Sequence, residues 1–278
     1  EFQLNNFTLS LEHRGPDSNG IFLDESKTVG LGHTRTSIFD LSKDGSQPMS
    51  CLSKRYWITF NGTIYNFIEI KKELELLGHK FKSSTDTEVI LVAYLEWGDQ
   101  CQFKFNGDWA FAIWDEIGKN LFVSCDRFGT KPLYYIQNKS YFIFASELKA
   151  IKAMGIDLVP RKSGLSSFLT VGYLPSPYTL FEGINRLPAG HFLRWSEGKT
   201  TATPYIRPSN YRLHHSNEEA TRLYQVRLQE AVERHNDRKD RRRMRKNGLE
   251  SAMWENGTHE SSDRRRLSEI ISQQGNEI

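Results

Sequence analysis

The chain has 278 residues, of which 38% are hydrophobic, and this length and composition predict one or two domains with a real hydrophobic core. The formal net charge of +3 is concentrated in residues 234–246, where eight Lys and Arg stand against two Asp, which leaves 29 basic and 32 acidic residues elsewhere. Because this basic segment has no interleaved aromatic residues and no known nucleic-acid recognition motif, we expect no nucleic-acid partner.

The cysteines and the N-terminal segment indicate the cellular environment. Cys51, Cys101 and Cys125 form no close pair, which argues against disulfides and a zinc site and favours the reducing cytoplasm. No apolar run approaches the about eighteen residues of a membrane span, so we expect no membrane partner. The first residues lack the regions of a signal peptide and an initiator methionine, so the chain is expected to start inside a longer protein.

Short runs rich in aromatic and β-branched residues, punctuated by Gly and Asp, predict strands of antiparallel sheets in the first half of the chain. These runs are 56–60, 110–114, 120–123 and 141–145. Apolar spacing predicts helices over 68–77 and 86–97, each followed by a glycine. The mixture predicts an α+β fold with helices layered on antiparallel sheets.

The composition changes after Pro204. Ser216 followed by Glu219 is typical of a capping box and predicts a helix over 217–233. From Arg234 onward apolar residues become scarce, so residues 234–278 are predicted to be a largely disordered basic tail.

Polar residues at expected strand and helix ends carry the candidate chemistry. Arg35 offers a planar fork for a carboxylate, and Asp86 offers an acceptor for an ammonium group. The side-chain amide of Asn61 and the backbone N–H of Gly62 can converge on one oxygen as an oxyanion hole. Each residue also has a plainer interpretation: Asn-Gly as a hairpin turn, Arg35 as a solvated charge and Asp86 as a helix cap. Together they describe a site for an α-amino acid whose side-chain amide is attacked.

Nine short motifs follow one another along the first 191 residues. They are His-Arg-Gly-Pro-Asp (13–17), Gly-His-x-Arg-x-Ser-Ile-x-Asp-Leu-Ser (32–42), Gln-Pro-Met (47–49), Asn-Gly-x-Ile-Tyr-Asn (61–66), Thr-Asp-Thr-Glu-Val-Ile-Leu (85–91), Gly-x-x-Ala-Phe-Ala-x-Trp-Asp (107–115), Asp-Arg-Phe-Gly-Thr-Lys-Pro-Leu-Tyr-Tyr (126–135), Phe-Ala-Ser-Glu-Leu-Lys-Ala (144–150) and Leu-Pro-Ala-Gly-His (187–191). In this order they resemble the class II glutamine amidotransferase domain of glutamine-dependent asparagine synthetases. The resemblance implies an amidotransferase domain over 1–206, a linker and first synthetase helix over 207–233, and the tail over 234–278.

By this resemblance the fold is an N-terminal-nucleophile sandwich of four layers, with two antiparallel sheets between helices. Arg35 would hold the α-carboxylate of glutamine and Asp86 its α-ammonium group. Asn61 and Gly62 would form the oxyanion hole, and the backbone around Ile38 would line the same pocket. The segment 126–135 is expected to be structural.

Two departures from the family qualify this expectation. The family's nucleophile is an N-terminal cysteine whose own α-amine is the general base, and no cysteine precedes His13 here. Thr63 stands where the family often has glutamate. The synthetase half, which would hold ATP and Mg²⁺, is expected to be absent, because 246–251 lacks the glycine pair of a phosphate loop.

The function that this pattern predicts is the glutaminase portion of an ATP-dependent asparagine synthase that amidates aspartate, truncated or frame-shifted and inactive alone. Glutamine is the expected small-molecule partner, with no metal or cofactor in this chain. The alternative is a non-catalytic domain that binds glutamine or regulates a partner, with Arg35 and Asp86 kept and the chemistry lost.

Overall fold

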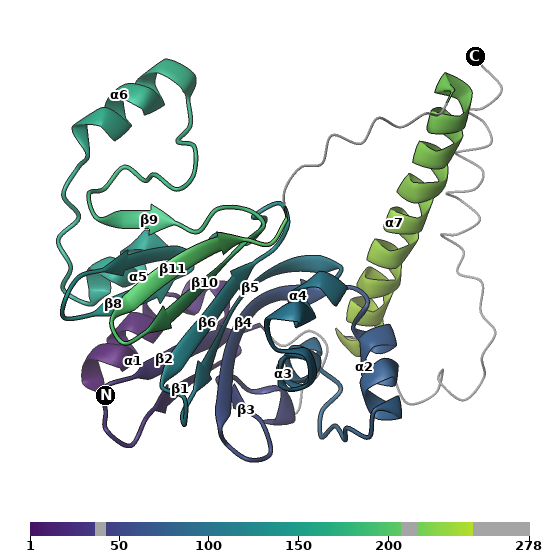
Figure 1. The fold of residues 1–278 in the computed structure, drawn as a ribbon, viewed down its shortest axis with the longest axis horizontal. Coiled ribbons are helices and arrows are strands. Elements are labelled where there is room, and N and C mark those ends of the chain that lie inside the picture. The colour runs from purple at the N-terminus through teal and green to yellow at the C-terminus, as the bar shows by residue number, and fades with distance from the viewer. Residues whose placement is uncertain (37–42, 207–215, 247–278) are drawn as a thin grey trace. The chain divides into compact units, whose positions relative to one another are not determined.

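The computed structural model describes residues 1–36, 43–206 and 216–246, and the chain divides into two units, Glu1–His235 and Asn236–Ile278 (Figure 1). The layers described below belong to the first unit. Its helices are α1 (Phe2–Leu9), α2 (Phe67–Leu76), α3 (Asp86–Trp97), α4 (Cys101–Lys104), α5 (Leu148–Ala153) and α6 (Lys162–Val171), with 3-10 turns at Glu12–Arg14, Lys43–Gly45 and Gly98–Gln100; α7 (Asn217–Lys246) begins in this unit and ends in the second.

The described strands form three sheets, and all strand pairs within them are antiparallel. The largest sheet has the order β11-β10-β6-β5-β4-β3, with β3 (Met49–Ser50), β4 (Tyr56–Ile64), β5 (Gly107–Asp115), β6 (Asn120–Cys125), β10 (His191–Ser196) and β11 (Lys199–Pro204). A second sheet pairs β1 (Ser18–Leu23) with β2 (Gly30–Arg35). The third has the order β8-β7-β9, with β7 (Tyr134–Gln137), β8 (Phe142–Ala145) and β9 (Ile184–Arg186).

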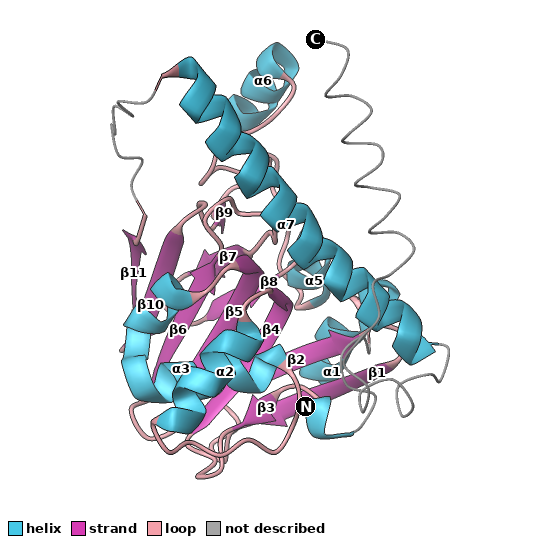
Figure 2. Ribbon diagram, turned by 90° about the vertical axis from the view of Figure 1, so that its right-hand side faces the viewer, coloured by secondary structure: helices cyan, strands magenta, loops and turns pink. Residues whose placement is uncertain are grey.

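Side chains on β5 show how the six-stranded sheet is covered on both faces. Phe111 and Ile113 belong to a core that also contains residues of α2, α3 and α4, and Figure 2 shows α2 and α3 lying over this sheet. Ala112 and Trp114 alternate with them and belong to a second core, which is shared with β2, β7 and β8. Because side chains alternate across a strand, an apolar run such as β5 is buried on both sides.

A third core closes the other side of the smaller sheets. Ile136 of β7 and Ile143 of β8 pack with Ala150 and Ile151 of α5 and with Phe7 of α1. The resulting order is helices, six-stranded sheet, smaller sheets and helices. The α+β class and the layered antiparallel sheets predicted from the sequence are therefore confirmed, with the second layer divided into a two-stranded and a three-stranded piece.

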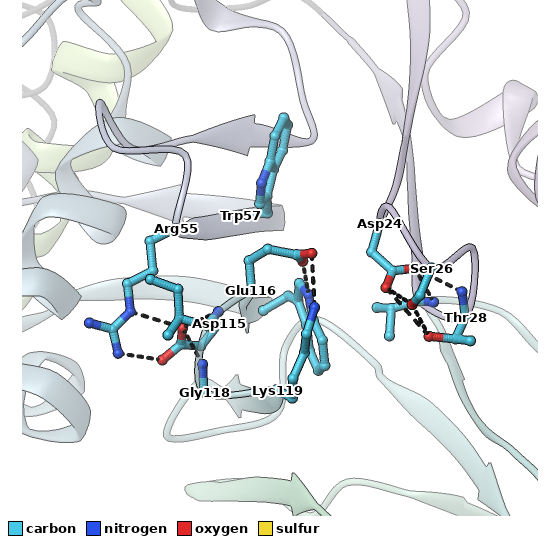
Figure 3. Close-up of polar contacts among 12 residues, drawn as sticks. Asp24, Ser26, Thr28, Arg55, Trp57, Asp115, Glu116, Gly118 and Lys119 are labelled. Carbon is cyan, nitrogen blue, oxygen red and sulfur yellow. Dashed lines mark hydrogen bonds and ion pairs between the residues drawn. The ribbon is translucent and has the colours of Figure 1, made fainter.

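An ion pair at one end of the six-stranded sheet ties β4 to β5. Arg55 donates through Nε and Nη2 to the two oxygens of Asp115 at 2.9 and 2.8 Å, and the N–H groups of Ile117 and Gly118 donate to Asp115 Oδ1 (Figure 3). Burial raises the pKa of Asp115, but Arg55 and the two amides outweigh it and hold that pKa below its ordinary value. The carboxylate thus stabilises the turn between β5 and β6 in its ionised form.

One helix cap and one helix end differ from the expectations. The N-cap of α3 is Thr85, whose side chain accepts the N–H of Glu88 at 3.3 Å, and Asp86 is the first residue inside the helix rather than its cap. Helix α7 begins after Ser216, whose Oγ accepts the N–H of Glu219, as the capping box predicted. It then runs past residue 234 to Lys246, because Arg and Lys favour helix even without an apolar face.

Candidate active site

The Asn61-Gly62 pair lies inside β4 and not in a hairpin turn, because both residues pair with β5 in continuous register. Gly62 has a φ of +152°, and a Cβ at this position would lie 2.1 Å from the carbonyl oxygen of Asp108. Only glycine therefore allows this close approach of the two strands. The Asn61 side chain lines a cavity, and its Nδ2 atom is buried without a hydrogen-bond partner among the described residues.

Arg35 and Asp86 both lie near the start of α3, and neither is among the residues that line the cavity. Arg35 is the last residue of β2, and a Cβ on Gly45 would lie 2.2 Å from Arg35 Nη2 and 3.1 Å from Thr85 Cγ2. Asp86 is buried, and its Oδ2 accepts the N–H of Ile64 at 3.1 Å. The Asp86 carboxylate is thus hydrogen-bonded to β4, the strand that also carries Asn61. Ile38, the remaining pocket residue expected from the sequence, lies outside the described residues.

Gln47 is a positioning residue that the sequence reasoning did not single out beyond its motif. Its buried side chain accepts the N–H of Phe60 through Oε1 at 2.7 Å and donates through Nε2 to Thr87 Oγ1 at 3.2 Å. The first bond holds β4 at the residue before Asn61, and the second reaches α3 at the residue after Asp86. Gln47 therefore couples the two ends of the candidate site.

Replacing Gln47 with Ala is expected to lower the free energy of unfolding by about 2 kcal/mol, because two buried polar groups lose their partner. Urea denaturation of the variant measures this loss, with Gln3→Ala on the exposed face of α1 as a matched control. Equal midpoints for the two variants would show that the bridge contributes nothing to the fold.

A cavity of about 570 Å³ separates β2 from β8. Its walls combine apolar side chains from both layers with many polar residues, among them His33 and Asn61. Within the described residues, β2 and β8 are each paired on one side only. The cavity therefore lies between two unpaired strand edges, in the plane of the divided second layer, where an extended segment could complete the sheet.

His33 places a half-buried titratable ring on the cavity wall. Its Nε2 lies 3.1 Å from the carbonyl oxygen of Phe60, and its Nδ1 is buried without a partner among the described residues. Burial lowers the pKa of His33 to about 4, with the charge of Arg35 acting in the same direction. The imidazole is therefore uncharged near neutral pH. His33 stands two residues before Arg35 in a strand, and this spacing indicates that both side chains lie on the same face of the strand. No role was assigned to His33 from the sequence.

None of the three cysteines lines the cavity, and all three are buried. Burial raises the pKa of Cys101 far above its ordinary value and that of Cys125 to about 12. A thiol in such surroundings stays protonated and unreactive at neutral pH. Cys101 and Cys125 therefore supply no thiolate nucleophile to the candidate site.

Two further motifs have visible structural roles. His13 and Arg14 bond to Glu147 at 3.1 and 2.8 Å, which ties the segment after α1 to the start of α5. Asp126 accepts the backbone N–H groups of Trp109, Phe128, Thr130 and Lys131 and so shapes the loop after β6. Both motifs therefore stabilise connections between elements of the fold.

The described residues contain no group of three His, Cys, Asp or Glu side chains placed to hold a metal ion. Among the helices that the structure describes, none is both long and apolar enough to cross a membrane.

The layered fold has counterparts among solved structures. One is the glutamine phosphoribosylpyrophosphate amidotransferase from B. subtilis complexed with ADP and GMP, with a TM-score of 0.56 and 20% identity, covering 75% of this chain and 47% of that chain. Another, described as the allosteric regulatory enzyme of purine biosynthesis, gives a TM-score of 0.57 at 22% identity over the same shares. At these identities the likeness concerns the fold alone.

Sequence comparison then identifies the family. The model of the glutamine amidotransferase domain family matches residues 1–206, and the chain belongs to this family. Among its relatives, asparagine synthetase [glutamine-hydrolyzing] 1 of Bacillus subtilis is 38% identical over 196 residues, which are 70% of this chain and 30% of the relative. Asparagine synthetase [glutamine-hydrolyzing] 3 of the same species is 39% identical over 199 residues, covering 70% and 32%. The chain thus spans about a third of the length of these relatives.

Proposed function

We propose that this chain is the glutaminase portion of an ATP-dependent asparagine synthase, which takes ammonia from glutamine to amidate aspartate. The observation that carries the proposal is the juxtaposition of Asn61, Gly62 and Asp86 through the bond from Ile64 N–H to Asp86, with Arg35 packed beside Thr85. This arrangement supports a site where a carboxylate, an ammonium and an oxyanion of one small amino acid are held together.

Each residue has a separate task in the proposed reaction. Arg35 binds the α-carboxylate of glutamine and Asp86 its α-ammonium group, while the backbone around Ile38 completes the pocket. A thiolate attacks the carboxamide carbon, and the electron pair of the C=O bond moves to oxygen, where Asn61 Nδ2–H and Gly62 N–H stabilise it. The α-amine of the nucleophilic residue, which took the proton of the thiol, returns it to the leaving nitrogen, so that collapse of the oxyanion releases ammonia. Water then hydrolyses the thioester to glutamate.

The nucleophile is the part of this chemistry that the three cysteines of the chain do not supply. By resemblance it is an N-terminal cysteine, and the cavity between β2 and β8 could accept the extended segment that carries it. ATP and Mg²⁺ would serve the synthetase reaction in the part of the relatives that this chain does not span, so no step here passes through them. The separated, unpaired cysteines support the cytoplasm as the compartment.

The purified chain is expected to bind L-glutamine but to release no ammonia from it above a blank. Arg35→Ala should weaken the binding about tenfold or more, because it removes a charge-assisted contact to the carboxylate. Isothermal titration and an ammonia assay measure the two quantities. As a matched control, Arg194→Ala removes an arginine of β10 whose partner is Asp99, outside the cavity. Ammonia release that disappears on substitution of Cys51 alone would overturn the assignment of the nucleophile.

The second candidate is a non-catalytic glutamine-binding domain. The buried, protonated Cys101 and Cys125 favour it, since neither can act as nucleophile. The two candidates differ once a cysteine-bearing segment is supplied: the first then gains glutaminase activity, and the second does not.

A further inference from the structure

The side chains of β2 alternate between two environments, and this places His33 toward the interior. Gly30 and Gly32 face α1, because a Cβ on either would touch Leu4 or Thr8 of that helix. Leu31 and His33 lie on the opposite face, toward the core between the sheets. Arg35, two residues further on, lies on the same face of β2 as His33, and the Cα atoms of the two residues are about 7 Å apart along the strand.

The spacing of Arg35 and His33 is comparable with the length of glutamine. Four C–C bonds of about 1.5 Å join the α-carboxylate carbon to the carboxamide carbon, an extended span of about 5 Å. A glutamine whose carboxylate is held by Arg35 can therefore direct its carboxamide along β2 toward His33. Asn61 stands on β4, next to the carbonyl of Phe60 that His33 contacts.

His33 and Asn61 both line the cavity, and each carries a buried hydrogen-bonding atom of the opposite kind that has no partner among the described residues. The Nε2 atom of His33 faces a carbonyl oxygen and must carry the proton, so Nδ1 holds a lone pair and can only accept. Asn61 Nδ2 can only donate. Both atoms are buried without partners among the described residues, although buried polar groups are normally satisfied. An acceptor on β2 and a donor on β4 are together the complement of a primary carboxamide, which carries N–H groups and an oxygen.

We propose that His33 is a specificity-determining residue that selects the carboxamide of glutamine over the carboxylate of glutamate. Its Nδ1 accepts one N–H of the glutamine side chain, while Asn61 Nδ2 donates to the amide oxygen. Glutamate has no N–H to offer and turns a negatively charged oxygen toward the His33 lone pair. The site therefore binds the substrate and releases the product. This inference rests on the proposed glutaminase function.

The neutrality of His33 agrees with this role. Its ring is uncharged near pH 7, because burial lowers the pKa to about 4. A protonated imidazole would instead attract the carboxylate of glutamate. The hydrogen-bonding capacity of the two atoms gives the selection, and the burial of the ring keeps Nδ1 unprotonated at neutral pH.

A matched pair of substitutions separates the two nitrogens of His33. In His33→Gln the side-chain amide can still donate to Phe60 O, but the acceptor at the Nδ1 position is lost. In His33→Asn the acceptor at that position is kept, and the donor to Phe60 is lost. A role confined to bracing β4 would make His33→Asn the more damaging change, whereas the proposed role makes His33→Gln the more damaging one.

The first measurement is calorimetric binding of L-glutamine and L-glutamate to the full chain. We expect the wild-type chain to prefer glutamine, His33→Gln to lower that preference about tenfold, as for one hydrogen bond, and His33→Asn to retain most of it. An unchanged ratio of the two affinities in His33→Gln, with the variant folded by circular dichroism, would overturn the inference.

The second measurement uses the chain with a relative's cysteine-first N-terminal segment placed before Glu1, and compares glutamine with L-glutamic acid γ-methyl ester. The ester keeps the carbonyl oxygen but has no N–H on its side chain. His33→Gln should lower kcat/KM for glutamine about tenfold and leave that for the ester nearly unchanged. Equal losses on both substrates would contradict the inference and leave the glutaminase function standing. A folded fusion that hydrolyses neither substrate, from a chain that binds no glutamine, would contradict the proposed function itself.

Discussion

A fusion that places the N-terminal segment of a relative, starting at its mature cysteine, before Glu1 is expected to hydrolyse glutamine without ATP. The junction belongs at Glu1 because α1 packs on β2, with Leu4 against Gly30 and Thr8 against Gly32. In this fusion Asn61→Ala should lower kcat about a hundredfold or more, because the lost donor matters most once the oxyanion forms. Steady-state ammonia release measures the effect.

The same fusion distinguishes transition-state contacts from binding contacts. Arg35→Ala and Asp86→Ala remove interactions that are present before and during the reaction, so they should mainly raise KM. Asn19→Ala is the matched control for Asn61→Ala, since Asn19 is an exposed strand residue that does not line the cavity. An active, folded fusion in which Asn61→Ala leaves kcat unchanged would show that the oxyanion-hole assignment is wrong.

The largest loss of stability is expected from Gly62→Ala. The new methyl group would lie 2.1 Å from Asp108 O on the paired strand, and the φ of +152° is unfavourable for any L side chain. We expect the free energy of unfolding to fall by about 3 kcal/mol, since the strain of the backbone adds to a clash that the sheet cannot relieve. Urea denaturation of the chain measures this change.

Gly78→Ala is the matched control for the backbone term. Gly78 also has a positive φ, +95°, but no atom lies within 4 Å of its added Cβ. Its substitution should cost about 1 kcal/mol, the conformational part alone. If the two alanines destabilise the chain equally, the approach of β5 to Gly62 does not require glycine.

The sequence predicted those features that depend on neighbouring residues. Helix α3 spans 86–97 as expected, because its apolar face and its closing glycine are local signals. The Asn61-Gly62 pair was singled out from residue type alone, although the alternative of a hairpin turn was wrong: the pair lies within a strand. Thr85 rather than Asp86 caps α3, which residue type alone could not decide, because both are good caps.

Other features depend on contacts between distant segments, and no local pattern contains them. Gln47 gains its importance from Phe60 and Thr87, which lie 13 and 40 residues away. The division of the second layer into two pieces, and the cavity between β2 and β8, follow from which strand edges have no partner strand in the described part of the chain. The burial that keeps His33 uncharged likewise comes from packing between the two sheets.

The sequence by itself determined the family, the layered α+β class and the candidate residues Arg35, Asp86, Asn61 and Gly62, because motifs and apolar periodicity are properties of short segments. Only the tertiary structure decided that Asp86 is hydrogen-bonded to the strand of Asn61, and that His33 and Asn61 line one cavity while each keeps a buried polar atom without a partner among the described residues. The physical reason is that hydrogen-bond satisfaction and desolvation depend on the whole set of neighbours of a side chain, and folding alone brings that set together.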